Sequence, residues 1–165
     1  MKSHQELMTG CISNLKNKKD SMEFFEEQKL NYEDVKALLE NSGTLFTPPP
    51  YYLYSTQKLE EYSKKLSNFA YFILGKENDN VICFIAYYKN EQNKQLYVPL
   101  LCVQEKFQRN GLGHKMLEIL SKNKDFSSIG LEVNKVNTKA YNFYIKDNFK
   151  IKEDRTEKFL MEKLL

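Results

Sequence analysis

The amino-acid sequence predicts a single α+β domain, in which helices flank a mixed and mostly antiparallel sheet. Three observations lead to this class. Apolar residues recur at helical spacing through the first forty residues. Aromatic and β-branched runs, separated by short polar turns, then occupy residues 69–103. From there on, helical and extended patterns alternate without an internal repeat or a linker, so we expect one domain over residues 1–165.

The N-terminal segment, residues 1–45, is expected to be helical. Apolar side chains at helical spacing indicate one helix over residues 7–15 and another over residues 21–30. A third helix should begin at Asn31, because an Asp three residues later completes the pattern of a capped helix start. Gly43 is the expected stop of that helix.

Three consecutive prolines, Pro48 to Pro50, interrupt any regular element after this segment. The tyrosine-rich stretch Tyr51–Tyr54 follows on the same irregular part. Thr56 is a candidate cap for the next helix. The inward face of that helix is expected to carry four apolar residues: Leu59, Tyr62, Leu66 and Phe69.

The sheet is expected to start with three strands over Phe69–Leu74, Val81–Tyr88 and Gln95–Val103. Connections this short predict an antiparallel meander. The remaining elements should follow in the order helix, strand, helix, strand, with these bounds: Gly111–Asn123, Ser128–Val133, Asn137–Asp147 and Arg155–Leu165. The first of these helices should bury Leu112, Met116, Leu117 and Leu120, and the second Ala140, Phe143 and Tyr144.

Composition excludes several classes of protein. The formal charge of +3 arises from 25 basic and 22 acidic residues without a run of like charge, so no nucleic-acid or membrane-binding patch is expected. Cys11, Cys83 and Cys102 are odd in number and widely spaced, which argues against a disulfide framework and against a zinc site. Neither a signal peptide nor an apolar stretch of membrane-spanning length is present, and we expect a cytoplasmic protein that needs no metal.

The segment Val103–Lys115 is the part of the sequence that suggests chemistry. A strand leads into a loop, and a helix starts at Gly111 and Gly113. A helix N-terminus presents unpaired backbone N–H groups and a partial positive charge, and glycine lets the backbone approach an anion closely. Gln108 and Arg109 would add side-chain donors. These residues therefore predict a phosphate site, although a glycine-containing helix start that binds nothing explains the same pattern.

Two other phosphate motifs are excluded. The dinucleotide pattern G-x-G-x-x-G would need glycine where Met116 stands, and the Gly-Lys-Ser/Thr tripeptide of a Walker loop is absent.

The segment resembles the acetyl-CoA signature of the GNAT acetyltransferase family, Q/R-x-x-G-x-G/A, with Gln108, Gly111 and Gly113 in its fixed places and Phe107 in the aromatic position before it. A second stretch is similar to the later motif of this family, an L-E-V strand followed by N-x-x-A-x-x-F/L-Y-x-K-x-G-F. Its matching residues are Leu131, Glu132, Val133, Asn137, Ala140, Phe143, Tyr144, Lys146 and Phe149. Asn148 stands where the family has glycine, a mild departure because Asn tolerates the left-handed conformation.

The resemblance covers residues 69–165 and implies the GNAT fold and an N-acetyltransferase that uses acetyl-CoA. It implies that the strand before the signature separates from its neighbour, so that Leu101, Cys102 and Val103 hold the pantetheine and the thioester carbonyl. The pyrophosphate would be held by the signature itself: Gln108, Arg109, Asn110, Gly111, Leu112, Gly113 and His114. By the same resemblance, Asn137 bonds the cofactor, and Tyr144 also contacts it and protonates the departing CoA thiolate.

Each assignment has a purely structural alternative. Tyr144 falls on the inward face of its helix and fits a core position, while Asn137 fits a helix cap. Cys102 in mid-strand is typical of an inert small hydrophobe rather than a nucleophile. His114 fits a phosphate contact or a solvated position better than a general base, and Glu132 fits a polar sheet edge.

The proton acceptor for the amine is not identified. Residues 96–103 contain no acid, so water, backbone carbonyls, a tyrosine such as Tyr97, or an acid of the N-terminal half remain alternatives. The resemblance implies that the stretch Phe46–Tyr54 forms the acceptor side, where a small-molecule amine is expected, while residues 1–45 are either a helical N-terminal extension or a further acceptor-side segment. A CoA-thioester sensor and a structural protein with a degenerate fold are the competing functions. The oligomeric state is not determined by the sequence, and a homodimer is compatible with it.

Overall fold

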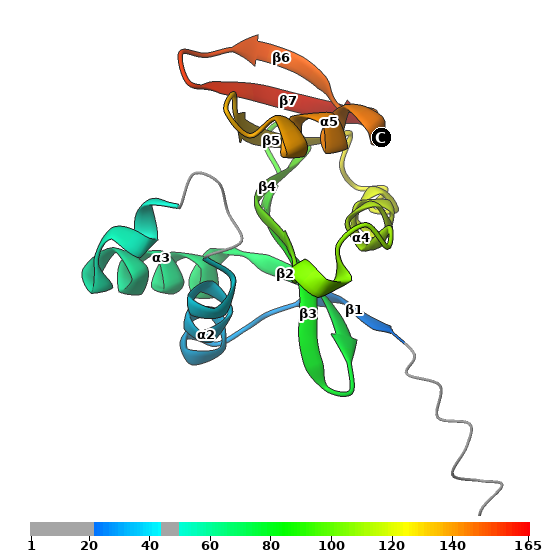
Figure 1. Ribbon diagram of the computed structural model, residues 1–165. Coiled ribbons are helices and arrows are strands. Elements are labelled where there is room, and N and C mark those ends of the chain that lie inside the picture. Colours follow the sequence, from blue (N-terminus) through cyan, green and yellow to red (C-terminus); the bar gives the residue numbers. More distant parts are fainter. Residues whose placement is uncertain (1–21, 44–49) are drawn as a thin grey trace, which may run out of the picture.

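The computed structural model of the protein describes residues 22–43 and 50–165, which form seven strands and four α-helices. The strands are β1 (Glu23–Gln28), β2 (Tyr71–Glu77), β3 (Asn80–Asn90), β4 (Gln95–Val103), β5 (Ser128–Asn134), β6 (Lys150–Asp154) and β7 (Lys158–Leu164). The α-helices are α2 (Tyr32–Ser42), α3 (Thr56–Phe69), α4 (Leu112–Ser121) and α5 (Thr138–Lys146), and two 3-10 turns are η2 (Tyr51–Tyr54) and η3 (Glu105–Phe107). Figure 1 shows this arrangement, which confirms the predicted fold class.

The strands form one sheet in the order β1-β2-β3-β4-β5-β7-β6. The predicted meander is confirmed, because β2, β3 and β4 are antiparallel neighbours. The strand predicted over Ser128–Val133 is β5, which runs parallel to β4, and β7 returns antiparallel beside β5. The edge strand β6 was not predicted from the sequence, since all five of its residues are exposed and no burial period marks it.

The prediction of a helix over residues 21–30 is wrong. Residues Glu23–Gln28 form strand β1, which pairs antiparallel with β2 and carries a bulge between Phe25 and Gln28. The following helix begins as predicted: the Asn31 side chain accepts a hydrogen bond from the backbone N–H of Asp34, and Gly43 is its C-cap. The helix predicted over residues 7–15 and the stretch 46–49 lie outside the described residues.

Helix α3 confirms the predicted inward face at Leu59, Tyr62 and Leu66, which are all buried. Phe69 does not belong to this face, because 65% of its surface is exposed where the helix ends. The helix is capped by Ser55, whose hydroxyl accepts from the Lys58 N–H, one residue earlier than predicted.

Two apolar cores lie on opposite faces of the sheet. The first is formed with α4 and α5, and its buried members include Met116, Leu117 and Phe149. The second is formed with α2 and α3 and includes Val35 and Leu66. Figure 1 shows the two helix pairs on different sides of the central strands. Among the described helices, none has both the length and the apolar character that a membrane crossing requires.

Strand β4 contributes to both cores because it carries a bulge. Its pairing with β3 shifts between Ala86 and Tyr88, so that two β4 residues, Val98 and Pro99, lie opposite one residue of β3. Leu96 and Val98 belong to the core of α4 and α5, whereas Leu100, after the bulge, belongs to the core of α2 and α3. Burial alternates regularly along the strand, but the face on which the buried side chains lie changes at the bulge.

Candidate active site

The sheet opens between β4 and β5. These parallel strands pair only from Gln95 with Ser128 to Tyr97 with Gly130, although β4 continues to Val103. Pro99 lies just beyond the last pair and has no N–H with which to continue a ladder. The β5-facing backbone edge of residues 98–103 is therefore free among the described strands. The sequence analysis missed Pro99, although a proline in mid-strand is a recognisable signal for such a break.

Two of the three strand residues assigned to the cofactor, Leu101 and Val103, are partly buried and pack on the core of α4 and α5. The third, Cys102, lies in the opposite core with 6% of its surface exposed. Burial raises the pKa of the Cys102 thiol to about 12, so this thiol is protonated at neutral pH. The interpretation of Cys102 as an inert small hydrophobe therefore fits the structure, and that of a nucleophile does not.

Gln108 fastens the signature loop to the end of β4. Its side-chain amide donates to the Val103 carbonyl at 3.0 Å, and its side-chain oxygen accepts from Lys139 Nζ at 2.6 Å. The sequence analysis expected a side-chain donor toward phosphate, but in the structure this amide holds the loop in shape. Arg109 is exposed with a positive φ of 65°, and the Asn110 side chain closes the turn onto the Phe107 carbonyl at 3.3 Å.

The loop ends at Gly111, which has a φ of 76° and is the N-cap of α4. The first backbone hydrogen bond of the helix runs from the Lys115 N–H to the Gly111 carbonyl at 2.9 Å. In the described part of the chain, the N–H groups of residues 109–114, including those of Leu112 and His114, have no backbone or side-chain acceptor. This row of free donors at a helix N-terminus lies where the sequence predicts an anion site.

The two glycines of the signature serve different purposes. A Cβ at Gly111 would meet nothing within 4 Å, so glycine is favoured there by the backbone conformation alone. A Cβ at Gly113 would lie 2.8 Å from Cζ of Phe143, a ring on α5. Gly113 is therefore required for the close approach of α4 and α5, a role that the sequence analysis did not predict.

Helix α5 carries the other two candidates. The Asn137 side chain accepts from the Ala140 N–H at 3.1 Å and caps the helix, as the structural alternative predicted. The Tyr144 ring lies edge-on against Phe143 and Phe149, at centroid distances of 5.0 and 5.4 Å. Its hydroxyl forms no hydrogen bond with a described residue, and burial raises the pKa of Tyr144, with a smaller contribution from the charge of Asp147. The partly buried ring thus packs against the core of α4 and α5, while the hydroxyl stays protonated and forms no hydrogen bond with a described residue.

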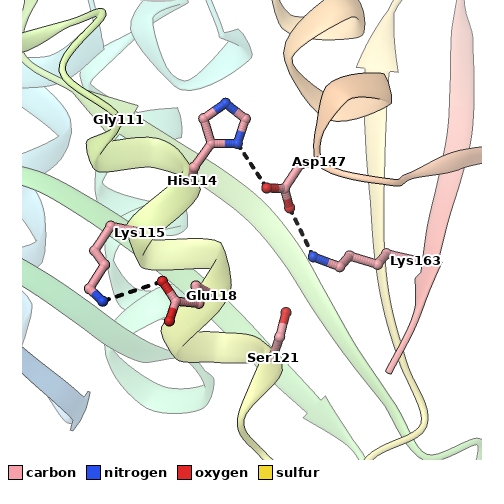
Figure 2. Close-up of a pocket in the computed structure, with 7 residues that line it drawn as sticks. All are labelled: Gly111, His114, Lys115, Glu118, Ser121, Asp147 and Lys163. Atoms are coloured by element: carbon pink, nitrogen blue, oxygen red, sulfur yellow. Dashed lines mark hydrogen bonds and ion pairs between the residues drawn. The ribbon is translucent and has the colours of Figure 1, made fainter.

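A cavity of about 440 Å³ adjoins the start of α4, and Gly111 and His114 line it (Figure 2). Asp147 lies on its far side and accepts from His114 Nδ1 at 2.8 Å and from Lys163 Nζ at 3.0 Å. No sequence signal pointed to Asp147 or Lys163, because only the fold brings them to the start of α4.

On the other face of the open sheet, Glu132 accepts hydrogen bonds from Arg155 and from Lys158 Nζ, the latter at 3.2 Å. Burial raises the pKa of Tyr97, and the charge of Glu132 raises it further. Glu132 and Tyr97 therefore lie close together at the opening of the sheet. Asn148, in the place of the usual glycine, has a φ of 68°, which confirms that Asn adopts the left-handed conformation there. Among the described residues, no group of three or more His, Cys, Asp and Glu is arranged to hold a metal ion.

Solved structures of low sequence identity share this fold. PaiA N-acetyltransferase from Thermoplasma acidophilum, in complex with coenzyme A, is 22% identical and has a TM-score of 0.67. The match covers 88% of this chain and 99% of that chain. A GNAT family acetyltransferase from Elizabethkingia anophelis, with acetyl-CoA bound, is 17% identical, with a TM-score of 0.65 and coverage of 89% and 100%. An acetyltransferase from Thermus thermophilus is 15% identical, with a TM-score of 0.68 and coverage of 88% and 97%.

No curated protein matches the chain. The family model for the acetyltransferase (GNAT) family matches residues 35–149, which is more than half of the sequence and contains the open strand, the signature loop and Tyr144. The chain therefore belongs to the GNAT family of acetyltransferases.

Proposed function

We propose that the protein transfers the acetyl group of acetyl-CoA to a primary amine of a small molecule. The observation that carries this proposal is that three elements of the two family motifs are unengaged: the free edge of β4, the free N–H row before α4, and the Tyr144 hydroxyl. We further propose that residues 1–165 act as one cytoplasmic domain without a metal.

The free groups fit an extended, polyanionic thioester. The N–H row at residues 109–114 and the α4 N-terminus would bind the pyrophosphate. The backbone of Leu101, Cys102 and Val103 would bind the pantetheine arm, which resembles a peptide in its amide groups. Asn137 caps α5 with its side-chain oxygen, which leaves its amide N–H₂ available to the cofactor.

Acetyl-CoA supplies an activated acyl group with a thiolate leaving group. A free backbone N–H of β4 would stabilise the oxyanion that forms when the amine attacks the carbonyl carbon, an effect of about 3–4 kcal/mol per donor. Tyr144 would then give its proton to the departing sulfur as the C–S bond breaks, which requires the phenol to be protonated, as its raised pKa ensures. The acetyl group passes directly to the amine, so no covalent intermediate forms on the protein, and the proton that the amine nitrogen loses goes to water.

The first experiment is calorimetric titration of acetyl-CoA and CoA into the wild type and into Gly111→Trp. The open space at Gly111 admits a side chain, which would then block the N–H row. Micromolar binding by the wild type, lost in a variant that retains its thermal midpoint, supports the cofactor site. The absence of binding by folded wild-type protein would refute the proposal.

A sensor that binds CoA thioesters without catalysis is the second candidate. It is favoured by the absence of an acid in residues 96–103 and by the two cations that already engage Glu132. Release of CoA thiol with a panel of primary amines distinguishes the two. An enzyme releases thiol with at least one amine and loses roughly 10²–10⁴-fold in kcat in Tyr144→Phe, without loss of acetyl-CoA affinity. A sensor binds but releases none.

A further inference from the structure

Asp147 joins three elements around the cavity in Figure 2. It is the C-cap residue of α5, and its two carboxylate oxygens accept from His114 on α4, at 2.8 Å, and from Lys163 on β7, at 3.0 Å. Only 12% of the Asp147 side chain and 19% of the Lys163 side chain are exposed. By contrast, the Lys115–Glu118 pair on the same cavity is 48% and 59% exposed, so solvent screens it far more strongly.

The two helices linked by Asp147 carry the two halves of the candidate site. His114 is the third residue of α4 and the last residue of the free N–H row, and its ring lies 4.5 Å from that of Phe143. Tyr144 precedes Asp147 by three residues on α5. The same end of α5 is closed by the backbone, because the Phe149 N–H donates to the Tyr144 carbonyl at 3.0 Å. A shift of Asp147 would therefore move Tyr144 relative to the signature loop.

We propose that Asp147 is a positioning residue, which clamps α5 to the start of α4 and thereby sets the distance between the Tyr144 hydroxyl and the cofactor loop. This inference rests on the proposed function for its catalytic consequence. The charge of Asp147 also contributes to the raised pKa of Tyr144, as expected for a carboxylate close to the phenol. Asp147 touches no reacting atom and acts through the placement of Tyr144.

The test compares Asp147→Asn with a control variant outside the candidate site, Glu27→Gln. The control removes an ion pair of the same length, 3.0 Å to Lys89, which joins β1 to β3 and lies outside the candidate site. Asp147→Asn is expected to lower kcat by about tenfold to a hundredfold while the Kd for acetyl-CoA stays within about threefold, because small displacements of a catalytic group have effects of this size. The control is expected to change neither. Equal kcat values for Asp147→Asn and the wild type would overturn the proposal.

A double-mutant cycle separates positioning from a general loss of stability. If Asp147 acts through Tyr144, the kcat effect of Asp147→Asn disappears in the Tyr144→Phe background. Additive effects would overturn the proposal. Should Asp147→Asn fold poorly because Lys163 loses its partner, Asp147→Asn/Lys163→Met removes the unpaired cation and is expected to regain the thermal midpoint with kcat still reduced.

Hydrogen exchange of the α5 amides distinguishes this proposal from the proposed function. Faster exchange in Asp147→Asn than in Glu27→Gln supports the clamp even if the wild type releases no thiol with any amine, a result that would reject only the acetyl transfer. Unchanged exchange of the α5 amides in Asp147→Asn would reject the clamp, even if the wild type is an active enzyme.

Discussion

Substitution of Gly113 by alanine tests whether the contact between α4 and α5 is as close as the structure indicates. Helix propensity alone predicts that alanine stabilises a helix by up to about 1 kcal/mol over glycine. The added methyl group would instead lie 2.8 Å from Cζ and 3.1 Å from Cε2 of Phe143. Ordinary carbon–carbon contacts begin near about 3.5 Å, so the ring must move by roughly 0.7 Å. Overpacking of this kind costs about 1–3 kcal/mol.

The net expectation is that Gly113→Ala lowers the free energy of unfolding by about 1–2 kcal/mol, which corresponds to a fall of about 2–8 °C in Tm for a domain of this size. Urea titration and calorimetry measure both quantities. Phe143→Leu removes the ring atoms that clash, so Gly113→Ala should cost less than about 0.5 kcal/mol in that background. A Gly113→Ala variant that is as stable as the wild type or more so, with no coupling to Phe143→Leu, would refute the close-contact argument.

Three further predictions concern other parts of the molecule. Asn137→Ala should lose about 1 kcal/mol of stability, because the helix cap is missing, and should bind acetyl-CoA more weakly in calorimetry. Asn137→Ser restores the cap but not the side-chain amide. Recovered acetyl-CoA affinity in Asn137→Ser would therefore contradict a role for the amide. Burial raises the pKa of Cys83 to about 11 and of Cys102 to about 12, above the ordinary value of 9.0. Both thiols stay protonated in the folded protein, whereas in the unfolded chain they ionise above about pH 9. The free energy of unfolding should therefore be unaffected by these thiols below about pH 9 and should fall above it, by at most about 1.4 kcal/mol per pH unit for each thiol. A Tm that stays level from about pH 8 to 10.5 would contradict this. Cys102→Ala should retain thiol release in the amine assay, and a loss of more than about tenfold at unchanged Tm would argue for a direct role of the sulfur.

Much of the fold could be predicted because local pattern and tertiary structure agree. The strand over Gln95–Val103 and the cap at Asn31 are found where the sequence indicates them. Strand β1 was misjudged because its glutamates favour a helix and Phe24 and Phe25 are adjacent. Only pairing with β2 turns Phe24 toward the core and leaves Phe25 exposed. Strand propensity depends on such neighbours, which a single sequence does not display.

The candidate site divides in a similar way. The free N–H row follows from glycines and a helix start, which are local features and were predicted. The contact of Gly113 with Phe143 and the clamp at Asp147 join residues about thirty positions apart in sequence. Neither leaves a local pattern, because each depends on how two helices are packed. Pro99 is an intermediate case, because a proline in mid-strand is a local signal, but which edge of the strand it interrupts depends on the neighbouring strand.

The bulge in β4 explains why its regularly spaced buried residues enter two different cores. Every second residue from Leu96 to Cys102 is buried. Leu96 and Val98 enter the core of α4 and α5, whereas Leu100 and Cys102 enter the core of α2 and α3. Loss of one of the two bulge residues would leave a regular ladder in which Leu100 still lies opposite Ala86, so the later side chains would keep their sides, whereas loss of a residue after the bulge would move every later side chain of β4 to the other side. Substitutions along β4 can accumulate one at a time, but a deletion within residues 100–103 would have to be compensated at once. Outside the two bulge positions, natural variants of this chain should therefore differ in the composition of this strand far more readily than in its length.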